Sequence, residues 1–166
     1  MKKFILLLLM LSATVSYCQN DTPQREAFTL KLAVDKEQFY EVEVEPEPYF
    51  VAQKSLQLYA GDELLIEAEI AGDTIASMKV VKAIKYPERT IKIEFRQTTE
   101  DNKHDQMILS VHNPFKRQLM YDAAMFIVGH NEWVTTSIVP VFPGISGYET
   151  WHDVIISLVL HSWRFE

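Results

Sequence analysis

Tyr40-Glu41-Val42-Glu43-Val44-Glu45 decides the fold class, because apolar and acidic side chains alternate along it without interruption. A period of two is typical of a β-strand, in which successive side chains point to opposite faces. The tyrosine and the two valines would face one side, and the three glutamates the other. The stretch therefore predicts an antiparallel strand with one face covered and one face in water.

The same alternation recurs further along the chain. Residues 63–70 and 90–97 carry apolar side chains at every second position, with mainly charged ones between them. The apolar positions are Leu64, Ile66, Ala68, Ile70, Ile91, Ile93 and Phe95. More apolar strands are expected at residues 106–112, 121–128, 133–139 and 154–160. The last of these is apolar on both faces except at Ser157, which predicts a central strand covered on both sides.

Turn signals separate the expected strands. Ala60-Gly61-Asp62 and Ala71-Gly72-Asp73 bracket residues 63–70, and Gly-Asp suits the positive φ and side-chain capping of tight turns. Because Pro140 and Pro143 cannot lie in a paired central strand, residues 140–153 are expected to form a long connection between sheets. The best helical candidate is a short turn at residues 49–57.

About nine short strands with turns every eight to twelve residues predict an all-β fold, an antiparallel β-sandwich, with a closed barrel as the alternative. We expect a single domain over residues 27–166. Residues 19–26 are polar and are expected to form a flexible lead-in.

The first eighteen residues have the layout of a secretory signal peptide: two lysines, an apolar run at 4–11, then small or polar residues. Two outcomes are open at Cys18. A cut after Cys18, the favoured one, makes Gln19 the N-terminus. In the other, Cys18 is lipidated, although Tyr17 departs from the small residue that a lipobox has there. Both predict export to the periplasm or the cell surface, and only the second predicts a membrane anchor.

Charge and cysteine content exclude some partners and cross-links. Removal of residues 1–18 changes the formal net charge from −7 to −9 and leaves no cysteine in the chain. An acidic protein repels phosphate backbones, so nucleic acid is not expected as a partner. The exported domain must be stabilised by its hydrophobic core without disulfides.

The pattern Asn113-Pro114, Tyr121-Asp122, Pro143-Gly144, Trp151 and Leu158-Val159-Leu160 resembles the closing half of immunoglobulin-like modules in exported bacterial proteins. It is also similar to small protease inhibitors with an immunoglobulin-like sandwich, although it offers no inhibitory loop. The resemblance covers about the last 60 residues and implies an immunoglobulin-like β-sandwich.

Familiar catalytic and metal-binding motifs are absent from the sequence. Gly144-Ile145-Ser146-Gly147 lacks the spacing of a nucleophile elbow, and the five histidines form no paired ligand motif. Residues 99–102 are acidic but lack the alternating order of a calcium loop. We therefore expect no catalytic residue, no metal and no cofactor.

Aromatic side chains are the remaining candidates: Tyr49, Phe50, Phe142, Tyr148 and Trp151 are expected in proline-containing connections rather than regular strands. They would either form a recognition surface or, as we favour, cap the open ends of the core.

The leading hypothesis is a non-enzymatic exported protein that binds a protein or an envelope component. The alternatives are a secreted hydrolase or carbohydrate-handling accessory with its site in residues 140–152, and a protease inhibitor. A hydrolase should have a polar pocket near Ser146 and His152, a binding protein a shallow aromatic patch, and an inhibitor a long convex loop.

Overall fold

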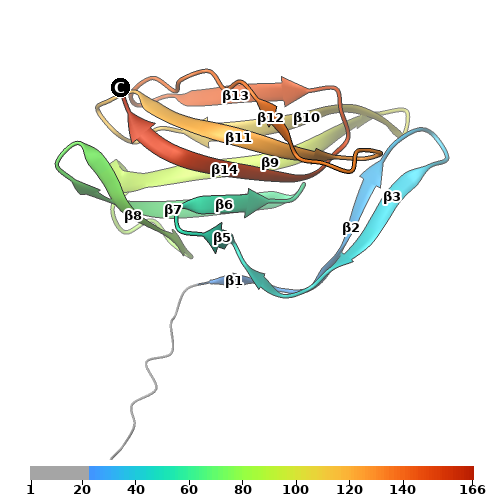
Figure 1. The fold of residues 1–166 in the computed structure, drawn as a ribbon, viewed down its shortest axis with the longest axis horizontal. Coiled ribbons are helices and arrows are strands. Elements are labelled where there is room, and N and C mark those ends of the chain that lie inside the picture. The colour runs from blue at the N-terminus through green and yellow to red at the C-terminus, as the bar shows by residue number, and fades with distance from the viewer. Residues whose placement is uncertain (1–22) are drawn as a thin grey trace, which may run out of the picture.

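The computed structural model describes residues 23–166, so the predicted signal peptide and Cys18 lie outside the described residues. Within them, two five-stranded sheets lie face to face and every strand pair is antiparallel (Figure 1). The described part of the chain contains one helix, the short 3₁₀ helix η1 (Pro87–Arg89). The predicted all-β, antiparallel class is confirmed.

Sheet I has the strand order β13-β10-β9-β7-β8. Its strands are β7 (Asp62–Ala71), β8 (Thr74–Val81), β9 (Thr90–Glu100), β10 (Lys103–His112) and β13 (Ser146–Trp151). Sheet II has the order β12-β11-β14-β6-β5. Its strands are β5 (Phe50–Ala52), β6 (Ser55–Leu58), β11 (Leu119–Ile127), β12 (Val134–Thr136) and β14 (Ile155–Phe165).

The inner faces of both sheets form one hydrophobic core. Ile66 and Phe95 from sheet I and Leu58 and Leu158 from sheet II are completely buried in it. The apolar positions predicted to be covered in residues 63–70 and 90–97 are buried, except that Ile70 is exposed, and Glu67 on the opposite face is buried as well. Ile70 lies beside a register shift in the pairing with β8, one residue before the end of β7.

The strand predicted at residues 40–45 forms, but in neither large sheet. β3 (Phe39–Val44) pairs with β2 (Phe28–Ala33) in a separate hairpin at one end of the molecule (Figure 1). Its glutamates face outward, where Glu41 pairs with Lys31 at 3.5 Å. Its other face packs with Ile156 of β14 in a second, smaller core. The hairpin therefore covers part of the sandwich.

Two local predictions are corrected by the structure. Residues 49–57 form no helical turn: Leu56 and Leu58 are both fully buried at strand spacing, and β6 pairs with β14. The connection predicted at 140–153 does cross from sheet II to sheet I, but it contains β13. Gly147 and Glu149 occupy the inward positions of β13, so the strand lacks the expected apolar alternation.

Both predicted Gly-Asp turns form as expected, with φ of 105° at Gly61 and 60° at Gly72. None of the helices in residues 23–166 is long and apolar enough to cross a bilayer.

Tyr121 of β11 makes the stability of the fold sensitive to alkaline pH. Its ring is 4% exposed and lies 4.7 Å from the ring of Trp163. Burial, with a smaller contribution from Glu149, raises the pKa of the phenol above its usual value. The folded protein therefore favours the neutral phenol, and its stability is complete below about pH 10, the pKa of tyrosine in an unfolded chain.

We expect the free energy of unfolding to fall as the pH rises above about 10. Tyr121→Phe removes this ionisation, so the variant should lose less stability between about pH 9 and 11 than the original protein. Urea unfolding at a series of pH values measures both slopes. Equal slopes would contradict the assignment.

Candidate functional site

The five aromatic residues singled out from the sequence lie on two different sides of the sandwich. Lys54, between β5 and β6, donates to the carbonyl of Ile75 in β8 at 2.9 Å, so the β5 and β8 edges meet on one side. Trp151 of β13 donates through Nε1 to Thr136 of β12 at 3.1 Å, so the β12 and β13 edges meet on the other. Sheet order places these two sides opposite each other.

Tyr49 and Phe50 therefore lie on the β5–β8 side, and the other three lie on the β12–β13 side. Phe50 is in β5, and Tyr148 and Trp151 are in β13, which corrects their placement in irregular connections. Tyr49, Phe50 and Trp151 are half-buried against the core. Phe142 and Tyr148 are 57% and 68% exposed.

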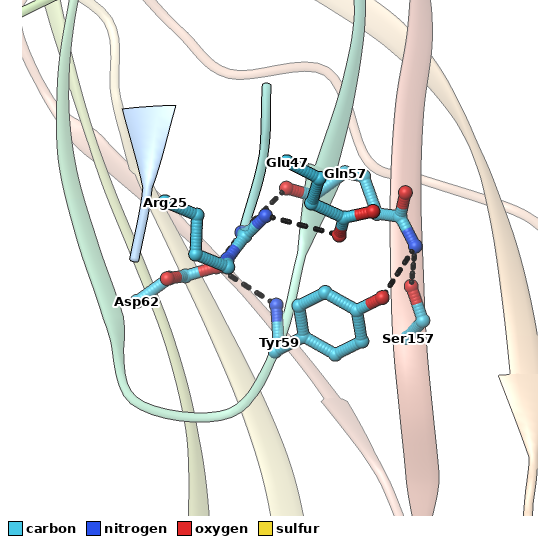
Figure 2. A network of polar contacts seen from close by, with 6 residues as sticks. All are labelled: Arg25, Glu47, Gln57, Tyr59, Asp62 and Ser157. Carbon is cyan, nitrogen blue, oxygen red and sulfur yellow. Dashed lines mark hydrogen bonds and ion pairs between the residues drawn. The ribbon is translucent and has the colours of Figure 1, made fainter. Parts of the chain in front are cut away.

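On the β5–β8 side, a buried polar network surrounds Arg25 of β1 (Gln24–Arg25), a strand that pairs with β4 (Glu47–Pro48) (Figure 2). Arg25 is 4% exposed. Its Nη2 donates to Asp62 Oδ2 and, at 3.1 Å, to the carbonyl of Gln57. Its Nη1 donates to Glu47 Oε1 at 3.5 Å. The charge is thus paired, and β1 is fastened to the start of β7.

Two tyrosine rings enclose the same guanidinium, with centroids 4.4 Å (Tyr49) and 4.8 Å (Tyr59) from its central carbon. Burial raises the pKa of both phenols, with Asp62 adding to the shift of Tyr49 and Glu47 to that of Tyr59. The electron-rich faces of the two rings attract the guanidinium, which is a cation–π contact. The cation site is therefore filled by the chain itself, and its role is to anchor β1.

Sequence reasoning missed this network. The polar composition of residues 19–26 predicts a flexible lead-in, yet Gln24 and Arg25 form a strand. Asp62 was assigned to a turn, where it does accept from the backbone N–H of Tyr59 at 2.8 Å. Arg25 and Asp62 are 37 positions apart, and no spacing rule joins them.

Removing one partner of the Arg25 network should destabilise the protein strongly. Arg25→Met leaves the Asp62 carboxylate without its cation, and we expect a loss of about 3–5 kcal/mol in unfolding free energy. Arg25→Lys should restore only part of it, because an ammonium cannot reproduce the planar fork. Lys31→Met breaks the exposed Lys31–Glu41 pair and should cost about 1 kcal/mol or less. Similar losses in urea unfolding for Arg25→Met and Lys31→Met would contradict the anchor.

On the β12–β13 side, Asn113 fixes the connection that precedes β13. It is completely buried. Its Nδ2 donates to the carbonyls of Arg117 and Val141, both at 2.8 Å, and its Oδ1 accepts from Phe115 N–H at 2.9 Å. Its backbone donates to Ile145 and accepts from Gly144. One buried side chain thereby holds the loop after β10 and the connection into β13.

Val141 and Gly147 complete this attachment. Val141 is 2% exposed and exchanges two 2.9 Å backbone hydrogen bonds with Leu119. A Cβ added at Gly147 would lie 2.8 Å from Val141 Cγ2, so only glycine allows this approach. The connection is packed tightly at its centre.

The attached connection exposes apolar side chains. Phe142 to Ile145 form a tight turn, in which Pro143 is followed by Gly144 at φ 72° and Ile145 N–H donates to Phe142. Four hydrophobic residues within a stretch of ten positions have more than half of their surface exposed. This apolar group consists of Val139 (66%), Phe142 (57%), Ile145 (51%) and Tyr148 (68%).

We expect Gly147→Ala to destabilise the protein by about 1–3 kcal/mol, because the new methyl group overlaps Val141. Val141→Ala in the same chain should make the second substitution less harmful, so a double-mutant cycle by thermal unfolding should give a favourable coupling. Additive losses would contradict the steric explanation.

Ser146 lines a depression of about 580 Å³ on the outer face of sheet I, together with charged side chains that include Glu63 and Lys92. Across the strands it faces His112, with Ser146 Oγ 3.4 Å from His112 Nδ1. His152 is at the other end of β13, where its carbonyl oxygen lies 3.0 Å from His104 Nε2. The structure therefore does not bring Ser146 and His152 together.

The Ser146–His112 contact is longer than the usual nucleophile–base hydrogen bond of about 2.6–3.2 Å. A base also needs a third group to orient it, and within residues 23–166 no hydrogen bond to His112 Nε2 is found. The same residues contain no group of three or more His, Cys, Asp or Glu side chains arranged to hold a metal ion.

Comparison of the chain with protein-family models, with curated proteins and with solved structures finds no match.

Proposed function

We propose that this is an exported protein with an immunoglobulin-like β-sandwich that binds another protein or an envelope component without catalysis. Its binding site is the β12–β13 side. The observation that carries the proposal is the apolar group, with Val139, Phe142 and Ile145 on the connection held by the buried Asn113 and Tyr148 in the strand β13 that follows it.

The grouping of these side chains is what distinguishes them. Residues 23–166 contain ten exposed large hydrophobic residues, and four of them lie between positions 139 and 148. Single exposed apolar residues are ordinary, whereas a group of them is typical of interaction sites. Aromatic side chains such as Phe142 and Tyr148 dominate the energetics of many interfaces.

Rigidity supports the same conclusion. A loop that becomes ordered only on binding loses conformational entropy, which weakens the complex. Here Asn113 and the Val141–Gly147 contact hold the connection before any partner arrives. The apolar group is therefore presented in a binding-ready arrangement.

The proposed export of the protein rests on its first eighteen residues, which have the layout of a secretory signal peptide. The immunoglobulin-like assignment rests on the resemblance of the last 60 residues, together with two face-to-face antiparallel sheets. Location in the periplasm or at the cell surface fits both cleavage after Cys18 and lipidation at Cys18.

The alternatives have less support. A hydrolase or a carbohydrate-handling accessory would use the depression beside Ser146, whose contact to His112 is long for catalysis. A protease inhibitor would need a long convex loop, whereas Phe142 to Ile145 make a tight turn.

Crosslinking in intact cells tests the proposal. We expect the original protein to give a defined crosslinked partner, identified by mass spectrometry, and Phe142→Ala/Tyr148→Ala to reduce its yield roughly tenfold or more. Phe39→Ala/Val51→Ala is the matched control, because these side chains are 47% and 50% exposed but lie outside the apolar group. Equal losses in both double variants, or degradation of a polysaccharide by the pure protein, would refute it.

A further inference from the structure

We propose that β13 binds its partner by strand addition: an extended, basic segment of another exported protein pairs along its free edge and becomes the sixth strand of sheet I. The inference rests on the proposed function, and it specifies how the β12–β13 side makes contact and with what chemistry.

The free edge of β13 follows from its register. In the described part of the chain, β13 pairs with β10 alone. Asn113 N–H donates to Ile145, and hydrogen-bonded pairs then alternate along an antiparallel ladder. Gly147, Glu149 and Trp151 therefore direct their backbone groups toward β10. Those of Ser146, Tyr148 and Thr150 point away from the sheet, where an added strand would bind them.

Of the features that protect sheet edges, β13 has one, the inward-placed charge of Glu149. Proteins usually keep such edges short, or place lysine, proline or a bulge on them. β5 and β12 have three residues each, and β8 carries Lys79 and contains a bulge in its pairing with β7. β13 has six residues in regular register, with no lysine and no proline. Its one charged side chain, Glu149, accepts from Val139 N–H at 2.7 Å.

The negative charge of the protein indicates that the added segment is basic. The chain without residues 1–18 has a formal charge of −9, so a second copy is repelled and a basic segment is attracted. Across the outer face of sheet I, Tyr148 is in register with Ser110, then with Glu94, which pairs with Arg96 at 3.0 Å, and then with Glu63. An added residue opposite Tyr148 lies beside its exposed ring, which suits a lysine or arginine.

Thr150 offers a discriminating pair of substitutions. Because its N–H points to the free edge, Thr150→Pro removes no hydrogen bond to β10, and proline is tolerated at such positions. Thr150→Val changes the side chain and leaves the N–H. The probe is a synthetic basic dodecapeptide selected on the original protein from a displayed library, with a second peptide whose lysines and arginines are replaced by glutamate.

We expect Thr150→Pro to weaken binding of the basic peptide tenfold or more, Thr150→Val to change it less than twofold, and the glutamate peptide not to bind. Amide hydrogen exchange in the original protein gives a readout independent of any variant. On binding, the amides of Ser146, Tyr148 and Thr150 should become protected, whereas those of Gly147 and Glu149 should already exchange slowly.

The inference is overturned if no basic peptide is selected, if the exchange of those three amides is unchanged on binding, or if Thr150→Pro, folded by circular dichroism, binds normally. Sedimentation that shows a dimer of the pure protein, lost in Thr150→Pro, would assign the edge to a second copy instead. Crosslinking in intact cells distinguishes failure of strand addition from failure of the proposed function. A partner lost in Phe142→Ala/Tyr148→Ala but kept in Thr150→Pro leaves the proposed function standing and rejects strand addition.

Discussion

The hydrogen bonds of the buried Asn113 side chain are the interaction that fixes the backbone on the β12–β13 side. A buried amide without partners would destabilise the fold by about 1–3 kcal/mol, so its position is fixed by the groups that satisfy it. These groups belong to two different segments, residues 115–117 and residues 141–145. Satisfying one side chain therefore places the Phe142 turn, and the turn leads directly into the free edge of β13.

Arg25 is a second buried polar side chain whose position is fixed by its hydrogen-bond partners, but it carries a charge. Asp62, Glu47 and the carbonyl of Gln57 surround the guanidinium, and two tyrosine rings exclude water from it. Its Nε has no partner among the described residues, so the network is less completely satisfied than that of Asn113. Buried ion pairs add less to stability than to uniqueness in several proteins. Here the pair fixes where β1 lies.

The sequence was informative where a whole strand face is buried. β7, β9 and the central strand β14 could be placed because apolar residues recur at every second position or fill both faces. Alternation cannot say which sheet a strand joins, so β3 was assigned to the sandwich rather than to a hairpin. Strand periodicity does not predict β13, because Gly147 and Glu149 occupy its inward positions. Gly147 is required by the close approach of Val141, and Glu149 accepts a hydrogen bond from the backbone N–H of Val139.

The candidate site was predictable only in part. Exposed aromatic residues in the second half could be singled out, but Tyr49 and Trp151 could not be distinguished from Tyr148, since burial depends on contacts between distant segments. The free backbone groups of β13 have no sequence signal at all. They follow from strand order, which periodicity does not encode.

Fastening of β1 through Arg25 has a geometric consequence for a molecule held in a membrane. Seven peptide units separate Cys18 from Arg25, a span of about 25 Å at most. A lipid on Cys18 would therefore keep the β5–β8 flank close to the bilayer. The opposite flank, with β13, would look outward into the surrounding compartment.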